Sequence, residues 1–517
     1  MSVMSATGRP RNLVLAGMIF AVAMTFIDQT IVSIAAPNIQ RELHLTDTGM
    51  QWAINAYLVS LAALFAFGGR LADTVGHRKM VVLGVIVFAG ASTLCGLTPA
   101  NSAAEAWIIV FRAVQGAGGA IMFPAALGIV VQTFPLRERG KALALFFGIS
   151  GGLTAVGPLL GGFLTEWTWR AIFWVNIPVA VVALILIFIA KPVTEYKPAR
   201  TDYRGLALIV AGIALSVIGF QQSAIWGWGN VGTLACIVVG LALLVVFVLV
   251  ERRTTTPLMK VDIFRIRPFA VENLVLGVAM VAFVPMFFFA SEYAQISLGK
   301  TAETTGLVLL YFFLGFVVAS QIGGRMLDRI GAKRPVVLGC AIAAVGFGLW
   351  AGKMTDLTLN HQIWAIVIAG AGMGFMLSPA STDAVNRASR LSYGEATGIT
   401  QTVRNYSASL GLAILGTIEV SRMRSEVTSS LLAKGASPSA AAAGARQATA
   451  SSSGGSGTAA HIPSFIRLDF AHASQTVFYV MCGVMAAAAV VAFVGLRAGV
   501  QEDLATAPAT AAEAAEA

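Results

Sequence analysis

The sequence predicts an all-α integral membrane protein, because apolar runs long enough to cross a bilayer recur from one end of the chain to the other. Of its 517 residues, 57% are hydrophobic and only 12% are charged, whereas soluble globular chains carry about 25% charged residues. Runs of about 18 or more apolar residues with few charges are typical of membrane-spanning helices. A soluble fold could not bury this much apolar surface, so the composition favours a polytopic membrane protein.

Fourteen such runs define the predicted transmembrane helices. The first begins near Asn12 and continues for roughly 25 residues, which is longer than the apolar part of a cleaved signal peptide, so we expect it to remain as the first helix. The predicted spans are 12–37, 50–72, 79–98, 104–132, 141–165, 170–190, 205–223, 230–250, 269–294, 304–327, 335–352, 362–384, 395–420 and 473–496.

These spans predict three parts. Residues 12–190 would form an N-terminal six-helix bundle, 205–250 two accessory transmembrane helices, and 269–496 a C-terminal six-helix bundle. The segment 421–472 is rich in Ala, Ser and Gly. We expect it to be a flexible outer loop, with some helix in its Ala-rich part. The Ala-rich tail 500–517 is expected to be disordered.

The positions of the basic residues predict the orientation. A net charge of +10 would suggest nucleic-acid binding in a soluble protein, but here the basic residues lie in short loops between apolar runs, as the positive-inside rule requires. With a cytoplasmic N-terminus, cytoplasmic segments carry 24 Lys and Arg residues and outer segments carry nine. Five of those nine lie in 421–472, and long loops count little. We therefore expect a cell-membrane protein with both termini cytoplasmic, the lipid bilayer as a partner and no nucleic-acid partner.

Several chemistries lack their sequence signals. Each of the four cysteines lies inside an apolar run, where a thiol behaves as a small hydrophobe, so neither a disulfide framework nor a metal site is expected. The sequence contains no G-x-x-x-x-G-K-[ST] motif and no H-E-x-x-H motif, which argues against ATP hydrolysis and zinc chemistry on this chain. The protein is therefore not expected to be an enzyme.

An internal repeat relates the two predicted bundles. GGRLADTVGHRKMVVLG at 68–84 matches GGRMLDRIGAKRPVVLG at 323–339, with nine of seventeen positions identical. A weaker similarity links GAGGAIMFPA at 116–125 with GAGMGFMLSPA at 370–380. Eight predicted helices, an even number, separate the two strong copies, so the halves have the same orientation. Such parallel repeats are related by an axis along the membrane normal.

Each strong copy ends one helix and begins the next across a tight cytoplasmic loop. Gly68 and Gly69 would let a neighbouring helix approach closely, and Gly76 permits the turn. A basic loop that only sets topology need not recur in register, so the repeat favours a gating role. The predicted gating residues are Gly69, Arg70, Asp73, Gly76, Arg78 and Lys79 in the first copy and Asp328, Gly331, Lys333 and Arg334 in the second.

Two charged residues are predicted to lie deep in the membrane. Asp28 lies about nine residues from the outer end of the first span, roughly 13 Å at 1.5 Å per residue, and Arg112 lies at a similar depth in the fourth span. A charge at a helix centre costs at least about 2.5–3.5 kcal/mol. We therefore expect the two side chains to face the bundle interior and to approach each other, directly or through water. A static structural ion pair is the alternative to a functional one.

At these motifs the sequence resembles the major facilitator superfamily, and within it the fourteen-span drug:proton antiporters of the EmrB/QacA type. The loop at 68–79 resembles the superfamily's G-x-L-a-D-r-x-G-r-k signature. Three further segments resemble signatures of the antiporter family: FIDQTIVSIAAPNI at 26–39, IIVFRAVQGAGGA at 108–120 and WRAIFWVNIP at 169–178. A fourth, GISGGLTAVGPLLGG at 148–162, resembles the helix 5 signature; it keeps Gly157, Pro158, Gly161 and Gly162 but has Leu153 where glycine is expected.

The resemblance implies two six-helix bundles of the major facilitator fold, with two accessory helices between them. It also implies export of amphipathic, often cationic drugs in exchange for protons by alternating access, with a proton gradient in place of any cofactor and a monomeric chain. Asp28 would carry the proton or sense the cation, and Arg112 would tune it. Weaker candidates for the proton or substrate path are Gln29, Gln115, Glu292, Gln401, Arg404, Glu419 and the aromatic run Phe287, Phe288 and Phe289.

Two other functions remain open at this stage. A narrower exporter of a lipid, a self-made antibiotic or another metabolite would carry the same motifs. A membrane sensor or scaffold with a transporter fold is disfavoured, because the loop signatures, Asp28 and the helix 5 glycines are all retained. An aromatic run in a membrane helix also faces lipid or a neighbouring helix more often than a cavity, so Phe287, Phe288 and Phe289 are weak evidence for a substrate site.

Overall fold

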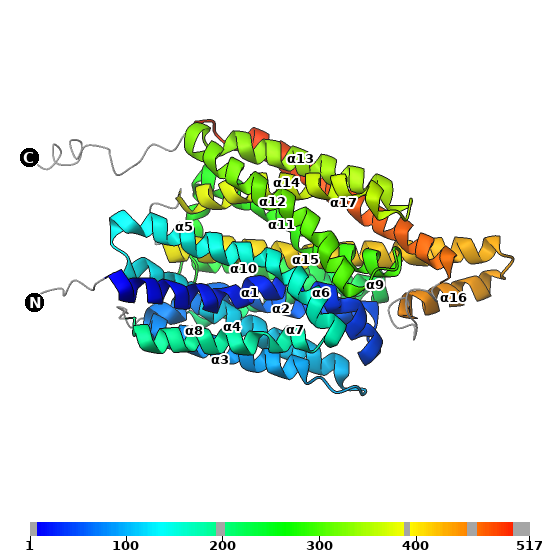
Figure 1. Ribbon diagram of the computed structural model, residues 1–517, viewed down its shortest axis with the longest axis horizontal. Coiled ribbons are helices and arrows are strands. Elements are labelled where there is room, and N and C mark those ends of the chain that lie inside the picture. Colours follow the sequence, from blue (N-terminus) through cyan, green and yellow to red (C-terminus); the bar gives the residue numbers. More distant parts are fainter. Residues whose placement is uncertain (1–7, 193–201, 387–392, 452–462, 500–517) are drawn as a thin grey trace, which may run out of the picture.

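The computed structural model describes residues 8–192, 202–386, 393–451 and 463–499, and in these ranges the chain is helical, without β-strands. Long helices run side by side along the longest axis of the molecule (Figure 1). The helices are α1 (Gly8–Leu43), α2 (Asp47–Val75), α3 (His77–Gly96), α4 (Ala104–Thr133), α5 (Leu136–Gly152), η1 (Leu153–Ala155), α6 (Val156–Trp167), α7 (Ala171–Trp174), α8 (Asn176–Ala190), α9 (Tyr203–Trp226), α10 (Val231–Glu251), η2 (Val261–Arg265), α11 (Arg267–Ile296), α12 (Ala302–Ile330), α13 (Lys333–Met354), η3 (Leu359–His361), α14 (Ile363–Asn386), α15 (Tyr393–Ala433), α16 (Pro438–Ser451) and α17 (Ser464–Gly495).

The fourteen predicted spans all correspond to helices. Thirteen segments of the described chain are long and apolar enough to cross a membrane. The fifth span is α5, η1 and α6 taken together, and the sixth is α7 with α8. The remaining predicted span lies in α15, which is 41 residues long but less apolar because it carries Gln401, Arg404 and Asn405.

The long helices run between two ends of the molecule. The start of α1 and the end of α17 lie at one end, the terminal face, at the left of Figure 1. The opposite end, where α1 ends and α17 begins, is the far face. Exposed tryptophans lie at helix ends on the far face, at Trp167, Trp226 and Trp364. Tryptophan is enriched where a membrane meets water, so this level marks one edge of the bilayer.

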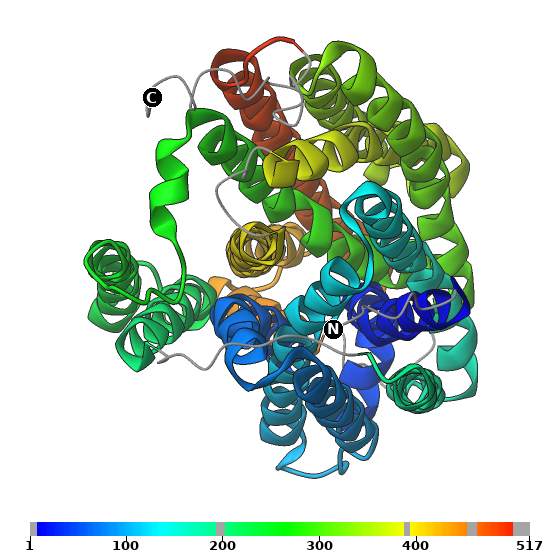
Figure 2. The ribbon, with the colours of Figure 1, turned by 90° about the vertical axis from the view of Figure 1, so that its left-hand side faces the viewer.

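The fold has two six-helix bundles and a helical hairpin beside them. Helices α1 to α8 form the first bundle and α11 to α17 the second, while α9 and α10 pack against each other at the edge of the molecule (Figure 2). The hairpin is joined to both bundles through α9. Asn55 of α2 donates a 2.6 Å hydrogen bond to Gln221 of α9 and accepts one from Ser409 of α15.

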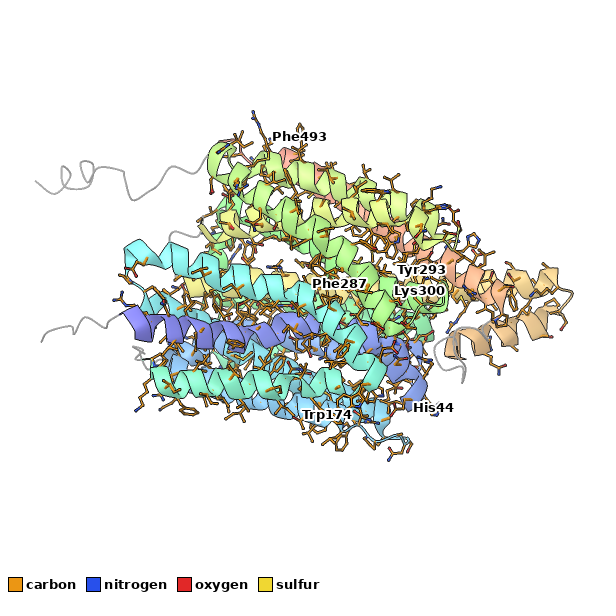
Figure 3. All side chains as sticks on the ribbon, in the orientation of Figure 1. His44, Trp174, Phe287, Tyr293, Lys300 and Phe493 are labelled. Atoms are coloured by element: carbon orange, nitrogen blue, oxygen red, sulfur yellow. The ribbon has the colours of Figure 1, made fainter. Side chains whose placement is uncertain are left out.

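The internal repeat is visible in the packing. In the first bundle α4 packs between α2 and α3, and in the second α14 packs between α12 and α13. The repeated loops turn at Gly76 and Gly331, whose φ angles of 115° and 81° suit glycine. Arg78 and Lys333, which occupy equivalent positions, lie over the rings of Phe188 and Phe493, each on the last helix of its own bundle. Phe493 is labelled in Figure 3.

The two bundles contact each other where α2 packs along α15, and again in the half nearer the far face. There α6 packs on α12, and α1 on α11. Gln295 of α11 donates a 2.9 Å hydrogen bond to the carbonyl oxygen of Ile34 on α1. At the α6–α12 crossing, a Cβ added to Gly306 would lie 2.3 Å from the carbonyl oxygen of Pro158, so this approach of two backbones requires glycine. These contacts close the far half of the interface.

The expected outer loop 421–472 is largely helical instead. Helix α15 continues past the bundle to Ala433, turns at Gly435 and is followed by α16 (Figure 1). Alanine has the highest helix propensity, and Ala441 and Ala445 of α16 are buried, so an Ala-rich segment that looked like a linker forms a second packed helix. Residues 452–462 of this segment, and the tail 500–517, lie outside the described residues.

Replacing Gly306 with valine should weaken closure of the far face, because the added side chain would collide with the α6 backbone and push α12 away. We expect the far-face ends of α6 and α12 to move apart. Spin labels at Trp167→Cys and Thr301→Cys, in a chain whose four native cysteines are replaced, would report this as longer distances in a double electron–electron resonance experiment.

The matched control is Gly90→Val, because a Cβ at Gly90 finds no atom within 4 Å. That variant should leave the label-to-label distance unchanged. The same distance distribution in Gly306→Val and the unmodified chain would show that this contact does not hold the far face closed.

Candidate functional site

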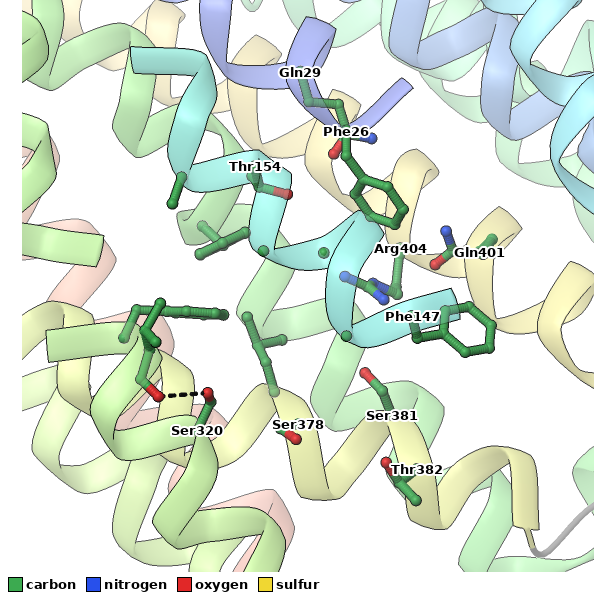
Figure 4. A pocket seen from close by; sticks show the side chains of 18 of the residues that line it. Phe26, Gln29, Phe147, Thr154, Ser320, Ser378, Ser381, Thr382, Gln401 and Arg404 are labelled. Atoms are coloured by element: carbon green, nitrogen blue, oxygen red, sulfur yellow. Dashed lines mark hydrogen bonds between the residues drawn. The ribbon is translucent and has the colours of Figure 1, made fainter. Parts of the chain in front are cut away.

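A cavity of about 650 Å³ lies between the two bundles, in the half nearer the terminal face. This volume is within the range of small-molecule sites, about 300–1,000 Å³. Its walls come from α1, α4, α5, η1, α11, α12, α14 and α15 (Figure 4). The lining residues are Phe26, Gln29, Leu127, Leu143, Phe147, Gly148, Gly151, Gly152, Thr154, Ala155, Phe283, Phe313, Phe316, Val317, Ser320, Gln321, Leu377, Ser378, Ser381, Thr382, Thr397, Thr400, Gln401 and Arg404.

Helix α15 provides the main polar wall. Thr397, Thr400, Gln401 and Arg404 follow the i, i+3, i+4, i+7 spacing that places residues on one face of a helix, and all four line the cavity. The hydroxyl oxygens of Thr397 and Thr400 have no hydrogen-bond partner within the described part of the chain. Polar groups in a membrane protein need a partner, so this face is prepared to receive a polar ligand or water.

Serines and threonines of α14 and α12 face α15 across the cavity, and aromatic rings fill the space between polar groups. Ser378, Ser381 and Thr382 lie on the wall opposite Gln401 and Arg404 in Figure 4. Phe26 and Phe147 line the side of the first bundle, and Phe283, Phe313 and Phe316 the side of the second. Small-molecule sites are usually lined by many apolar groups and a few polar ones.

Asp28 and Arg112 meet in the first bundle, next to the cavity but outside its lining. Arg112 Nη1 donates a 2.6 Å hydrogen bond to Asp28 Oδ2, and Gln115 Nε2 donates a 2.8 Å bond to Asp28 Oδ1. Arg112 Nε donates to the carbonyl oxygen of Ala53 on α2, and its guanidinium lies 4.5 Å from the centre of the Tyr57 ring. The expected approach of Asp28 and Arg112 is thus a direct contact, and Gln115 belongs to it rather than to the cavity.

The pair is closed to solvent. Asp28 and Arg112 are each 1% exposed, and Gln115 is fully buried. Both carboxylate oxygens of Asp28 accept hydrogen bonds. A buried ion pair is tolerated only when its remaining donors and acceptors are also satisfied, and here a main-chain oxygen and an aromatic face complete the shell of Arg112. The pair ties together α1, α2 and α4.

Two further carboxyl groups lie near the far face, away from the cavity. Glu292 on α11 and Glu419 on α15 are each 4% exposed, and they are close enough to influence each other electrostatically. Ser474 of α17 donates a 3.2 Å hydrogen bond to Glu419. The sequence places Arg404, Glu292 and Glu419 in one candidate group, but the structure separates them: Arg404 lines the cavity, whereas the two glutamates lie in its closed half.

The first copy of the repeated loop packs against the start of α15. Gly69, Arg70 and Asp73 line a second cavity of about 150 Å³, together with Lys260 and Glu395. The Lys260 ammonium lies 3.0 Å from the Glu395 carboxylate. Asp73 is half exposed and lies 3.3 Å from the ring of His77. In the second copy, Asp328 and Arg334 are exposed, as is Lys79 in the first.

The glycine-rich segment of α6 touches both bundles. A Cβ at Gly157 would meet the Thr30 hydroxyl of α1, and one at Gly161 would meet Ile31. On the opposite side, Gly162 lies against the first turn of α12. Thr30 Oγ1 also donates a 3.0 Å hydrogen bond to the carbonyl oxygen of Thr154, in the 3₁₀ turn that breaks the helix. The two bundles therefore meet and close at this segment.

Sequence reasoning missed most of the cavity wall. The expected aromatic run, Phe287, Phe288 and Phe289, is fully buried in helix packing, and Phe287 stacks on Phe313 with ring centres 5.3 Å apart (Figure 3). The aromatic rings that do line the cavity come from α1, α5, α11 and α12. Two signals were available in the sequence: the serines on either side of Pro379 on α14, Ser378 and Ser381, and the helical spacing of polar residues on α15.

Comparison with known proteins agrees with this arrangement. Residues 18–412 match the family model described as Major Facilitator Superfamily. The chain is 32% identical to the tetracenomycin C resistance and export protein of Streptomyces glaucescens, over 80% of this chain and 77% of that protein. It is 33% identical to the puromycin resistance protein pur8 of Streptomyces alboniger, over 76% and 79%. It is 30% identical to the multidrug resistance protein Stp of Mycobacterium tuberculosis, over 76% and 73%.

Solved structures with the same fold include two transporters. A bacterial homologue of the human lysosomal transporter Spinster, in an inward-facing and unoccupied conformation, aligns with a TM-score of 0.62 at 17% identity, covering 95% of this chain and 98% of that one. The xylose transporter XylE from E. coli, in a partially occluded inward-open conformation, aligns with a TM-score of 0.61 at 10% identity, covering 96% and 100%. At these identities the likeness establishes the fold.

Removing one partner of the Asp28–Arg112 pair should destabilise the protein strongly, because it leaves the other charge buried without a partner. Asp28→Ala or Arg112→Met should each cost about 3–5 kcal/mol. The double variant should cost less than the sum of the two single variants. Thermal unfolding in detergent, followed by intrinsic tryptophan fluorescence, measures all three.

Asp356→Asn is the control, because Asp356 pairs with Lys353 at the protein surface, 3.6 Å away and with both side chains partly exposed. Surface pairs contribute about 0–1 kcal/mol, so this variant should unfold near the temperature of the unmodified chain. Equal effects of the surface and buried substitutions would contradict the structural importance of the buried pair.

Proposed function

This chain belongs to the major facilitator superfamily, and on that premise we propose that it is a proton-driven efflux carrier for amphipathic small molecules. The observation that carries the proposal is the cavity between the bundles, bounded toward the far face by the contacts of α6 with α12 and of α1 with α11. A central site accessible from one side at a time is what alternating access requires. The resistance and export proteins among its relatives support drug efflux in particular.

The proposed orientation places the terminal face in the cytoplasm of the cell membrane. The excess of Lys and Arg in the loops of that face supports it. The cavity would then receive substrate from the cytoplasm or the inner leaflet of the bilayer. In this reading the chain works as a monomer, catalyses no covalent chemistry and needs a proton gradient but no bound cofactor.

Proton coupling is assigned to Asp28. A proton on this carboxyl would remove its charge and leave Arg112 unpaired inside the membrane, which is costly. Because the pair joins α1 to α4 and Arg112 also bonds to α2, the cost is relieved by a rearrangement of these helices. Protonation and movement of the first bundle are thereby linked. The repeated loops at 68–79 and 323–334 would control closure at the terminal face, and α6 closure at the far face.

A second candidate is an exporter dedicated to one compound. It is favoured by the fact that two relatives carry the name of a single antibiotic in their own names. Both candidates use the same cavity and the same coupling. They differ only in how many chemically distinct compounds are transported, so a panel of dyes and antibiotics in the transport assay below separates them.

Transport should be driven by an imposed pH gradient in proteoliposomes and should fail in Asp28→Asn, which keeps the shape of the side chain but cannot exchange a proton. Two fluorescent dyes that share a xanthene ring system, anionic fluorescein and cationic rhodamine 123, are suitable probes. Movement of either dye that depends on the protein and the gradient supports the proposed function. In Asp28→Asn we expect gradient-driven movement to fall to the rate of empty liposomes.

Asp356→Asn is again the matched control and should transport at the unmodified rate, since Asp356 lies at the surface. Dye binding to Asp28→Asn, measured by fluorescence anisotropy, shows whether the variant still folds and binds. Gradient-driven transport at the normal rate in Asp28→Asn would contradict the coupling role. Failure of the unmodified chain to move either dye, or any member of the panel, would contradict drug efflux.

A further inference from the structure

We propose that the cavity selects amphipathic anions, and that Arg404 is the residue that binds the acidic group of the substrate. This inference rests on the proposed function and specifies its substrate class. The family resemblance suggests cationic compounds instead. The proposal of anions is based on the charges of the residues that line the cavity.

Arg404 supplies the cavity's charge. Of the 24 residues that line the cavity in the described part of the chain, Arg404 is the only one with a charged side chain. It has no ion-pair or hydrogen-bond partner among the described residues, in contrast to Arg112, which contacts a carboxylate, an amide, a main-chain oxygen and an aromatic ring. The membrane interior penalises an unpaired arginine, so a ligand that brings an anion supplies the missing partner.

The groups around Arg404 fit an acidic ligand. Thr397 and Thr400 present hydroxyl groups without partners on the same helix face, and hydroxyl groups can donate hydrogen bonds to a carboxylate. Gln401 and Gln29 present side-chain amides, which also carry donors. A guanidinium binds carboxylates through two parallel hydrogen bonds. No carboxylate of the described lining competes for these donors or attracts a cation.

The remainder of the wall fits the apolar body of the substrate. Phe26 and Phe147 lie on the same side as Arg404 and Gln401 in Figure 4. Phe283, Phe313 and Phe316 complete an aromatic surface on the second bundle. A planar aromatic acid could place its rings among these side chains and its acidic group at Arg404. The cavity therefore combines one charged group with aromatic rings that lie both beside it and on α11 and α12.

Asp28 does not provide a competing cation site in this conformation. Both of its oxygens accept hydrogen bonds from Arg112 and Gln115, and it does not line the cavity. Glu292 and Glu419 lie in the closed half near the far face. Two other buried acids of the second bundle, Glu272 and Asp383, do not line the cavity either. A cation in the cavity would thus meet the positive charge of Arg404 with no described carboxylate beside it.

Binding of the two xanthene dyes to the full chain in lipid nanodiscs tests the proposal, with fluorescence anisotropy as the readout. Because a hydrogen-bonded charge contributes about tenfold or more in affinity, the unmodified chain should bind fluorescein at least about tenfold more tightly than rhodamine 123. Arg404→Gln should weaken fluorescein binding by about tenfold or more without weakening rhodamine 123. Arg404→Lys should retain part of the preference, and Arg404→Glu should reverse it.

Arg422→Gln is the matched control, because Arg422 lies on the same helix but is exposed beyond the cavity. It should leave the affinities of both dyes unchanged. A variant that had lost its fold would lose both dyes together, which separates misfolding from a change of selectivity. Unchanged fluorescein affinity in Arg404→Gln, or preference of the unmodified chain for rhodamine 123, would overturn the assignment.

The transport assay separates this inference from the function on which it rests. Gradient-driven movement of fluorescein in preference to rhodamine 123, lost in Arg404→Gln, supports both. Movement of rhodamine 123 alone would leave efflux standing and refute anion selection. Movement of neither dye, nor of any compound in the panel, would refute efflux and the anion site together.

Discussion

The buried contact between Asp28 and Arg112 is the interaction on which the first bundle depends. The bilayer offers no water to solvate a charge, so each charge placed at this depth must find a partner within the protein. Arg112 takes its partners from α1, α2 and its own helix α4. The ion pair therefore fixes the relative positions of three helices, and any change in its protonation acts on all three.

Arg404, unlike Arg112, does not find the partner that a charge inside the membrane needs among the described residues. It lies on α15 of the second bundle, no side chain in the described chain neutralises it, and it faces the cavity. A charge with partners on other helices holds those helices together. A charge without a partner that faces a cavity can bind a ligand of opposite charge. In the proposed mechanism, Arg112 serves proton coupling in the first bundle and Arg404 serves substrate recognition in the second, with the cavity between them.

The internal repeat and the glycine-rich segment of α6 explain how one fold can serve both proton coupling and substrate recognition in the proposed mechanism. Equivalent loops turn at Gly76 and Gly331, and equivalent glycines let α4 and α14 pack closely inside their own bundles, so each bundle is a firm unit. The close approach of α6 to α12 at Gly306, by contrast, joins the bundles. Two rigid bundles that meet where two helix backbones touch can separate as rigid bodies, which is the movement that alternating access uses.

Much of the fold was predictable from the sequence, and less of the site. The membrane spans follow from the length of the apolar runs alone. Asp28 and Arg112 were recognisable because a charge deep in the membrane needs a partner. The cavity wall was harder, because Ser, Thr and Phe are tolerated anywhere in a membrane helix, and only the packing decides whether they face lipid, a neighbour or a cavity. The aromatic run at Phe287 illustrates this, since its rings fill the interior of the second bundle. The sequence predicted some helix in the Ala-rich part of 421–472, where α16 lies, but not the continuation of α15 to Ala433.

The sign of the substrate charge also decides what drives the export. One-for-one exchange of a cation for a proton moves no net charge, so only the pH difference would drive it. One-for-one exchange of an anion for a proton moves two positive charges inward, and each is worth about 2.3 kcal/mol per 100 mV of membrane potential. A carrier that binds its substrate through Arg404 would therefore draw on the membrane potential as well as the pH difference. Arg404 would then influence both which compounds are bound and how steeply they can be concentrated outside the cell.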